Sequence, residues 1–372
     1  MGTITRGIAN NVVTGGKLDG TDGLSGTVSA SNIANASLTN ITSVSPSLGF
    51  AVTSVASDPV SPTEGQIWYN TTSKTLKGYQ NVVVAAAWAS GGNLNTARRG
   101  MMASNGGTQT AALSTGGIDG PTSVPGFTEL YNGTSWTVGS PLNTGRYAGA
   151  GFGTQTASIA AGGYSYPPNT FSDITESWNG TSWTNLPATS GNSGFYKTGT
   201  GTQTAGLVVG FGTTQNQYWN GSAWTTNPAT MNTSLNGRGV SGTQISAIAA
   251  GGNGPAEAVS SSESYNGTSW TSTSNINTAR YFLGAAGTSD SPSLIFQGNR
   301  SPGSPVSTAT ELWDGTSWTN TSSTSTPTNA VGSAGTATSA LSFGGDGPPI
   351  KAATEEWTGA FTALQTRTLT VS

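Results

Sequence analysis

Large apolar side chains recur along the chain at nearly regular intervals, each just beyond a short polar phrase. The phrase Asn-Gly-Thr-Ser-Trp-Thr occurs three times unchanged, and two close variants keep the same Trp position. These five phrases occupy 132–137, 179–184, 220–225, 266–271 and 314–319. Successive Trp residues lie 47, 41, 46 and 48 positions apart, from 136 to 183, 224, 270 and 318. A period of this length predicts a repeat architecture.

Each repeat contains four short segments that are separated by turn residues. In the first repeat they are 100–103, 107–113, 128–131 and a segment that carries Trp136. The first two are rich in small residues, whereas the last two carry rings and larger aliphatic side chains. Small residues fit inner strands that crowd an axis, and rings fit outer strands that pack sheet on sheet. We therefore expect an all-β fold without helices, in which each repeat is a four-stranded blade of a β-propeller.

The Asn-Gly pair of each phrase favours a two-residue type I′ turn, in which both central residues have positive φ. The Trp that follows would fill the gap between neighbouring sheets. The same residues also form an N-glycosylation sequon, which is the alternative interpretation of the phrase. Residues 1–6 lack the apolar core of a signal peptide, and the turn already explains the phrase. We therefore favour the turn.

Six repeats lie between about 94 and 365, and further strand-like segments flank them. Residues 64–90 contain three such segments, and 364–371 resembles the start of a first strand. We expect these ends to form a seventh blade, so that N- and C-terminal strands close the ring without an open edge. The alternative is six blades, with 64–90 as a separate cap. The propeller would then span 61–372.

Residues 1–60 do not follow the repeat. Their apolar residues are scattered among Ser, Asn and Thr without a single period, so the segment is too thin to fold alone. We expect it to order against a partner or a symmetry mate. Asp19 and Asp22 suggest a calcium loop as an alternative, but too few ligands are present. We therefore expect no metal and no cofactor.

Charged residues make up only 8% of the chain, and 54 of its 372 residues are Gly. Such a composition alone would fit a disordered linker. The periodic Trp and aliphatic residues, however, give each repeat apolar side chains that can form a core. The net charge of −3 provides no broad basic face for nucleic acid or an anionic membrane. No apolar run approaches the length of a membrane span. The absence of Cys excludes disulfides and thiolate chemistry.

One acidic residue recurs at the same offset in the repeats. It is Glu129, Glu176, Glu263, Glu311 or Glu355, and Gln217 replaces it once. A catalytic group is rarely needed in every blade, so we interpret this residue as structural. We expect it to form hydrogen bonds or ion pairs with the Arg that precedes the first strand, found as Arg98, Arg146 and Arg280.

Residues that break the repeat are better candidates for binding. The candidates lie mostly in or near the loops after the second strand of a repeat, and they are Asp119, Tyr164, Tyr166, Asp173, Arg300 and Asp346. A rigid frame with variable loops is a common way to build a binding site. The two Tyr residues could stack on sugar faces. The alternative is that their rings only cover the neighbouring blade.

Several repeated features together resemble the kelch repeat over about 64–372. They are the double Gly at 116–117, the Arg before the first strand, and the Tyr and Trp around the Asn-Gly phrase. The segment Glu-Gly-Gln-Ile-Trp-Tyr-Asn-Thr-Thr at 64–72 resembles one that is common in fibre and virion proteins of tailed phages. Segments 91–98 and 107–113 are similar to kelch-like repeats in structural proteins of such phages.

This resemblance implies a protein of the virion surface or tail. Residues 1–60 would dock to other virion proteins or form a homo-oligomer, and the propeller would face outward. Our first hypothesis is a tail-fibre or capsid-surface adhesin that binds host-surface polysaccharide. The second is a purely architectural decoration, collar or fibre component without a ligand.

A glycan-cleaving enzyme is the third hypothesis, and we do not favour it. Galactose oxidase-like kelch enzymes need His ligands and a Cys-modified Tyr, and this chain contains neither His nor Cys. The phrase at 314–318 looks similar to a sialidase box but lacks its Asp-x-Gly spacing. The remaining possibility is a glycosidase pair of carboxylates drawn from Asp119, Asp173 and Asp346. We expect no enzymatic activity.

Overall fold

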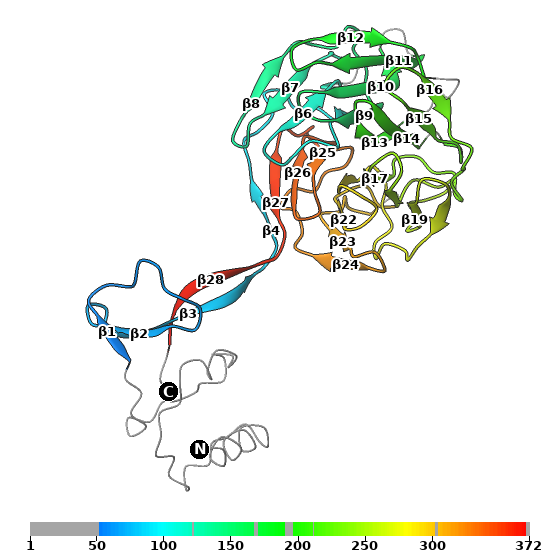
Figure 1. Ribbon diagram of the computed structural model, residues 1–372. Helices are drawn as coiled ribbons and strands as arrows, with labels where there is room; N and C mark the ends of the chain where they lie inside the picture. Colours follow the sequence, from blue (N-terminus) through cyan, green and yellow to red (C-terminus); the bar gives the residue numbers. More distant parts are fainter. Residues whose placement is uncertain are drawn as a thin grey trace. The chain divides into compact units, whose positions relative to one another are not determined.

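The computed structural model describes residues 52–120, 123–166, 170–189, 196–210, 212–301 and 304–369. These residues contain no α-helix and form seven four-stranded sheets, which confirms the predicted all-β fold (Figure 1). In this part of the chain no helix could cross a membrane.

The chain divides into two compact units, Met1–Val84 with Thr362–Ser372, and Ala85–Phe361. The boundary expected at residue 60 thus lies inside the first unit. Most of the segment predicted to attach to the virion falls outside the described residues, so its role stays a prediction.

The first unit contains one small sheet. Its strands, in spatial order, are β1 (Thr53–Val55), β2 (Ile67–Asn70), β3 (Thr75–Val84) and β28 (Phe361–Thr368). β1 runs parallel to β2, and β2 and β3 form an antiparallel hairpin. Asp58 supports this hairpin, because its carboxylate accepts hydrogen bonds from Trp68 Nε1 at 3.0 Å and pairs with Lys77 Nζ at 2.6 Å. The predicted pairing of the C-terminal segment with these N-terminal strands is confirmed.

The second unit contains the other six sheets, which we number as blades one to six. Blade one consists of β5 (Met102–Ala103), β6 (Ala112–Thr115), β7 (Thr128–Tyr131) and β8 (Trp136–Gly139). Blade two consists of β9 (Ala150–Gly153), β10 (Ser158–Ser165), β11 (Thr170–Trp178) and β12 (Trp183–Leu186). Blade three consists of β13 (Thr198–Thr202), β14 (Ala205–Val209), β15 (Gln217–Trp219) and β16 (Trp224–Thr226).

The remaining three blades follow the same order of strands. Blade four consists of β17 (Gly239–Gly242), β18 (Ala247–Ala250), β19 (Ser262–Tyr265) and β20 (Trp270–Ser272). Blade five consists of β21 (Gly284–Ala286), β22 (Ser293–Phe296), β23 (Thr310–Trp313) and β24 (Trp318–Thr321). Blade six consists of β25 (Gly332–Gly335), β26 (Ser339–Phe343), β27 (Thr354–Thr358) and, from the other end of the unit, β4 (Ala87–Ser90).

The blades of the second unit form a closed ring (Figure 1). The first strand of each blade contacts the first strand of the next, in the cycle β5, β9, β13, β17, β21, β25 and back to β5. The ring is closed because β4 pairs with β27, with Trp88 opposite Trp357. Closure by N- and C-terminal strands is therefore confirmed. Seven four-stranded sheets are present, but the cycle closes through six of them, which corresponds to the six-blade alternative.

The seven-blade expectation and the six-blade alternative differ in how they treat the segment 82–88. We expected it to be one strand, but β3 ends at Val84 and β4 starts at Ala87, in a different sheet. Trp88 explains the change, because its ring lies 4.9 Å from that of Phe296 in blade five and 5.4 Å from that of Trp357 in blade six. The residue that looked like part of a seventh blade instead completes the sixth.

The repeated Trp residues join neighbouring blades, as predicted. Trp183 Nε1 in blade two donates a hydrogen bond to Thr128 Oγ1 in blade one at 3.0 Å. Trp136 Nε1 in blade one makes the same contact with Thr354 Oγ1 in blade six at 3.0 Å. Both indoles are buried. Trp136 and Trp183 thus satisfy their polar atoms while they fill the space between two sheets.

The Gly-Thr-Gln phrase before the second strand also joins blades. Gln155 Nε2 of blade two donates to the carbonyl oxygens of Ala112 at 3.1 Å and Tyr131 at 2.5 Å in blade one. Gln109 of blade one makes the equivalent pair of bonds to blade six, across the closure. The phrase therefore holds the ring together, a role that its sequence did not reveal.

The Asn-Gly phrase does not form the turn that we predicted. Tyr131 pairs with Trp136, so the loop contains four residues rather than two. Gly133 has a φ of +93°, but Asn132 is not among the residues with positive φ, so a type I′ turn is wrong. Instead Asn132 Oδ1 accepts the backbone N–H groups of Thr134 at 3.0 Å and Ser135 at 2.9 Å. The Asn side chain shapes the loop.

Candidate functional site

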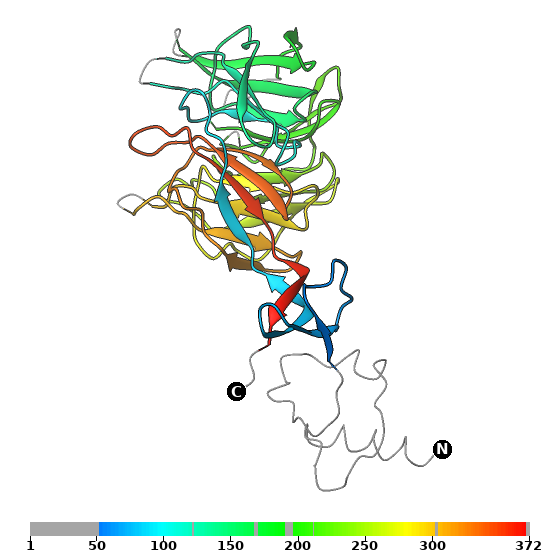
Figure 2. The same cartoon turned by 90° about the vertical axis from the view of Figure 1, so that its left-hand side faces the viewer.

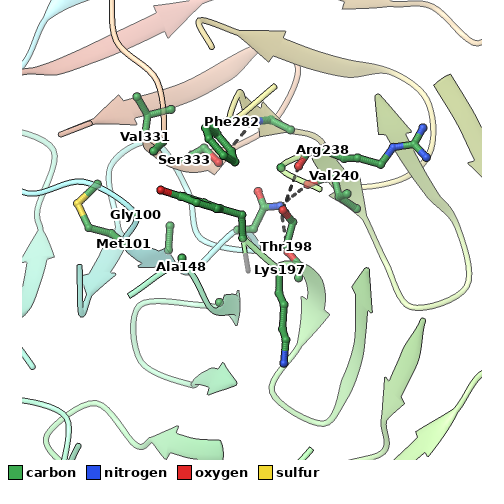
Figure 3. A pocket seen from close by; sticks show the side chains of 18 of the residues that line it. Gly100, Met101, Ala148, Lys197, Thr198, Arg238, Val240, Phe282, Val331 and Ser333 are labelled. Carbon is green, nitrogen blue, oxygen red and sulfur yellow. Dashed lines mark hydrogen bonds between the residues drawn. The ribbon is translucent and has the colours of Figure 1, made fainter. Parts of the chain in front are cut away.

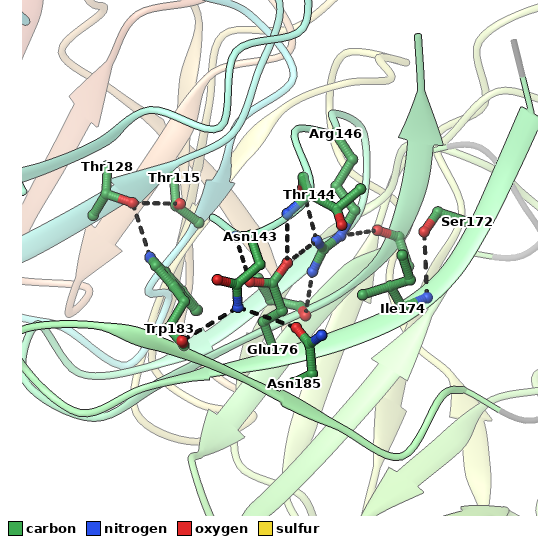
Figure 4. A network of polar contacts seen from close by, with 12 residues as sticks. Thr115, Thr128, Asn143, Thr144, Arg146, Ser172, Ile174, Glu176, Trp183 and Asn185 are labelled. Carbon is green, nitrogen blue, oxygen red and sulfur yellow. Dashed lines mark hydrogen bonds and ion pairs between the residues drawn. The ribbon is translucent and has the colours of Figure 1, made fainter. Parts of the chain in front are cut away.

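Buried ion pairs fix the approach to the first strand in four blades. In blade two, Arg146 pairs with Glu176, and both side chains are fully buried (Figure 4). Glu176 also accepts the backbone N–H of Asn143 at 2.8 Å, and Arg146 Nη2 donates to the carbonyl of Ala160 at 2.9 Å. Burial lowers the pKa of Arg146, and the charge of Glu176 opposes that shift. This confirms the predicted structural role of the repeated Glu.

The equivalent pairs are Arg98–Glu129, Arg238–Glu263 and Arg280–Glu311, each with an N–O distance of 2.7 to 2.8 Å. We had not identified Arg238. Six positions separate it from Asn232, whereas three separate Arg146 from Asn143, so the longer spacing conceals it.

Two residues before its first strand, each blade places a residue in the left-handed region next to the axis. Their φ values lie between +52° and +62°, and the residues are Gly100, Ala148, Tyr196, Gly237, Phe282 and Ala330. Backbone hydrogen bonds link several of them in sequence around the axis. The N–H of Gly100 donates to Ala330, that of Ala148 to Gly100, and that of Ala330 to Phe282, at 2.8 to 2.9 Å. We call this end of the axis the axial mouth.

Two of the six residues at the axial mouth carry large rings. The rings of Tyr196 and Phe282 have centroids 3.8 Å apart, and both line a cavity of about 80 Å³ (Figure 3). Gly237 makes room for them, because a Cβ at this position would clash with the Phe282 ring. Burial raises the pKa of Tyr196 to about 12, so its hydroxyl stays protonated at neutral pH.

Asn105 also lines this cavity. Eight positions separate Gly100 from Thr108 in blade one, whereas six separate Ala148 from Thr154 in blade two. The two additional residues allow the buried Asn105 Nδ2 to donate to the carbonyl oxygens of Val240 at 2.5 Å and Gly199 at 3.3 Å. Blade one is thereby tied directly to blades three and four.

Most of the predicted candidate residues lie beside the axial mouth. In the five blades where the structure describes the residue before the left-handed position, that residue bridges to the end of the second strand or to the loop after it, as in Tyr147 with Tyr164 and Asn329 with Asp346. Asp119 and Arg300 directly follow residues that form equivalent bridges, Ile118 and Asn299. These loops therefore share one face of the ring, and the orange-red loop between β26 and β27 is seen projecting from the second unit in Figure 2.

Asp346 is not free to act alone, because its carboxylate forms an ion pair with Arg99 at 2.8 Å. About a third of each side chain is exposed, at 34% for Arg99 and 36% for Asp346. Asp119 belongs to blade one, Asp173 to blade two and Asp346 to blade six. The structure thus assigns the three carboxylates to three different blades.

Blade two differs from the others in the length of its central hairpin. β10 has eight residues and β11 has nine, whereas the equivalent strands of blade one have four each. A cleft of about 510 Å³ lies against this hairpin, and its lining includes Asn143, Thr144, Tyr166, Phe171 and Asp173. Phe171 is 47% exposed and Tyr166 is 39% exposed. We call this site the blade-two cleft.

The aromatic residues of the hairpin continue from the cleft toward the axis. The ring of Tyr164 lies 5.3 Å from that of Phe171 and 5.8 Å from that of Tyr147, both edge to face. These two ring contacts of Tyr164 lie within blade two. Phe171 also breaks the repeat in the sequence, and the hairpin geometry places it beside Tyr164. No protein-family model matches the chain, and no curated protein is similar enough to assign it to a family.

Proposed function

We propose that this protein is an adhesin on the virion surface or tail of a tailed phage, and that it binds host-surface glycans. The blade-two cleft is the observation that carries the proposal. It places two exposed rings, Tyr166 and Phe171, beside a carboxylate and amide and hydroxyl groups. The phage origin is supported by the segment at 64–72 and the kelch-like repeats.

The chemistry of the cleft suits a sugar. A sugar ring has an apolar C–H face, which packs against an exposed aromatic ring, and hydroxyls around its edge. Asp173 can accept hydrogen bonds from those hydroxyls. Asn143 is fixed beside it, because its Nδ2 donates to the carbonyl of Trp183 and to Asn185 Oδ1. A cleft with a few convergent polar groups is the usual form of a small-molecule site. Both rings are more than one-third exposed, so a sugar can contact the exposed part of each ring.

The frame around the cleft favours recognition by preorganised groups. Buried ion pairs and Gln bonds fix the blades, so a ligand does not have to order the site when it binds. We further propose that residues 1–60 attach the protein to other virion proteins and hold several copies together. Several weak sites on one particle would then bind a polysaccharide with high avidity.

The test is binding of the full-length protein to purified host-surface polysaccharide, measured by surface plasmon resonance. Phe171→Ala and Tyr166→Ala should each weaken binding at least about tenfold, which corresponds to the loss of about one aromatic contact. Ile245→Ala is the matched control, because Ile245 is an exposed apolar residue of blade four, 64% exposed. Unchanged binding by both cleft variants would exclude this site.

Two other outcomes of this binding experiment would favour a different function. If the wild-type protein binds no host polysaccharide, a purely architectural role in the virion becomes the better account. The rigid six-bladed frame with its buried ion pairs favours that second candidate. Release of reducing sugar from the polysaccharide would instead indicate a glycan-cleaving enzyme.

A further inference from the structure

Aromatic side chains extend beyond the blade-two cleft on the same face of the ring. From Phe171 the next rings are Tyr164 and Tyr147, with centroid distances of 5.3 and 5.8 Å. At the axis, the ring centroids of Tyr196 and Phe282 lie 3.8 Å apart with the planes tilted by 32°, and the ring of Tyr281 lies 4.7 Å from that of Phe282. We call these six residues the aromatic track: Phe171, Tyr164, Tyr147, Tyr196, Phe282 and Tyr281.

The two halves of the track meet at the axial mouth. Tyr147 directly precedes Ala148 in blade two, and Tyr281 directly precedes Phe282 in blade five, so both flank the ring of left-handed residues. The pKa of Tyr196 is raised mainly by burial, and Arg99, Tyr147, Asp346 and Tyr281 all act on it electrostatically. Tyr196 and Phe282 line the same cavity as Ala148, the residue that Tyr147 directly precedes. The track runs from blade two across the axis to blade five.

The conformation of the two axial rings indicates a role beyond packing. Any residue other than Gly in the left-handed region costs about 1–2 kcal/mol, and in blades two and six this residue is a small one, Ala148 or Ala330. Blades three and five instead carry Tyr196 and Phe282, which remain partly exposed. Strained backbone of this kind tends to persist at functional sites.

Polar groups accompany the track, as a saccharide site requires. The partly exposed Arg99–Asp346 pair offers both donors and acceptors next to Tyr196. Because the pair is neutral overall, it suits the hydroxyls of uncharged sugars better than a strongly charged ligand. Asn299 lies beside Tyr281, with Asn299 Nδ2 at 3.4 Å from the Tyr281 hydroxyl.

We infer that the ligand is an extended chain of uncharged sugars, laid along the aromatic track from the blade-two cleft across the axial mouth to Tyr281. This inference rests on the proposed glycan-binding function and specifies its ligand. A terminal sugar would need only the cleft, whereas the track offers successive rings on which consecutive sugars of a chain can stack. The ligand is thus the interior of a polysaccharide rather than its end.

The test is a ladder of oligosaccharides of increasing length, prepared from the host-surface polysaccharide and titrated calorimetrically into the full-length protein. Affinity should rise with chain length and reach a plateau once the chain spans the track. Tyr281→Ala should weaken the longest oligosaccharide about tenfold and leave the shortest one unchanged. Phe171→Ala should weaken every length, and Ile245→Ala should weaken none.

A second variant guards against effects of misfolding. Tyr196→Gly removes one axial ring and places the residue type that suits positive φ at that position, as Gly100 does in blade one. It should keep the melting temperature of the wild type within a few degrees, but lose about tenfold in affinity for the longest oligosaccharide.

The outcomes separate the inference from the proposed function. If short oligosaccharides bind as tightly as long ones, or if the axial variants bind long chains like the wild type, the extended-chain inference is wrong and the cleft remains the site. If the folded wild-type protein binds no oligosaccharide of any length, both the inference and the proposed function are wrong.

Discussion

At the scale of single residues, the most distinctive feature is a buried Arg–Glu ion pair that recurs in four blades. Four blades bury an Arg beside a Glu, whereas blade three carries Gln217 in place of the Glu. Blade six keeps Glu355, which accepts the N–H groups of Ser325 at 2.8 Å and Thr326 at 2.9 Å. A buried carboxylate thus always has donors, as its desolvation demands. The fixed offset from Trp predicted this Glu, but Arg238 needed the structure.

Removal of one partner of a buried Arg–Glu pair should destabilise the protein far more than loss of a partly exposed ion pair. Arg146→Met leaves Glu176 charged and buried, so the free energy of unfolding should fall by about 3–5 kcal/mol. Arg99→Met breaks a pair that is about one-third exposed and should cost no more than about 1 kcal/mol. Urea unfolding of the two variants tests this difference. Equal destabilisation would contradict the structural role assigned to the buried pair.

At the scale of elements, the sequence predicted strands better than loops. Alternating small and large residues were enough to place the four strands of a blade, because each face must pack against a neighbour. The loop at 132–135 was predicted wrongly, because the letters Asn-Gly do not reveal whether the backbone or the Asn side chain shapes the turn. The length of the β10–β11 hairpin was also hidden, although its Tyr residues were identified.

The loop conformation seen in the structure predicts an unusual ranking of stability among variants at Asn132. Both Asn132→Ala and Asn132→Gly should destabilise the protein by about 1 kcal/mol, because both lose the acceptor for two N–H groups. Asn132→Asp should be close to neutral, since Asp314 accepts the same two bonds in blade five. Thermal unfolding at neutral pH distinguishes the variants. A stabilising Asn132→Gly would favour the type I′ turn instead.

At the scale of the whole molecule, the chain contains two units, and the propeller unit is closed by its own first and last strands. The sequence predicted this manner of closure, because both ends carry strand-like segments outside the repeats. It could not fix the number of blades, since nothing in 82–88 shows that the chain leaves one sheet and enters another. The candidate face was predictable from variable loops, but the aromatic track combines residues from three blades and needed their spatial order.

Closure predicts that Trp88 matters to the propeller as a whole. Trp88→Ala removes the contacts with Phe296 and Trp357 and the hydrogen bond from Trp88 Nε1 to Thr310 Oγ1 at 2.9 Å. The propeller should lose about 3–5 kcal/mol of stability, as for other large-to-small changes of aromatic residues. Tyr69→Ala in the first unit is the control and should leave the propeller transition unchanged. Calorimetry that finds no shift for Trp88→Ala would argue against this closure.

Hydrogen–deuterium exchange of the full-length protein, with and without a long oligosaccharide from the host surface, tests the central claim most directly. The account predicts slower exchange on binding at Tyr147, Tyr164, Phe171 and Asp173, and at Tyr281 and Phe282 across the axis. Protection confined to the Asn-Gly loops at the outer edge of the blades, or no protection at all, would contradict glycan binding by this face.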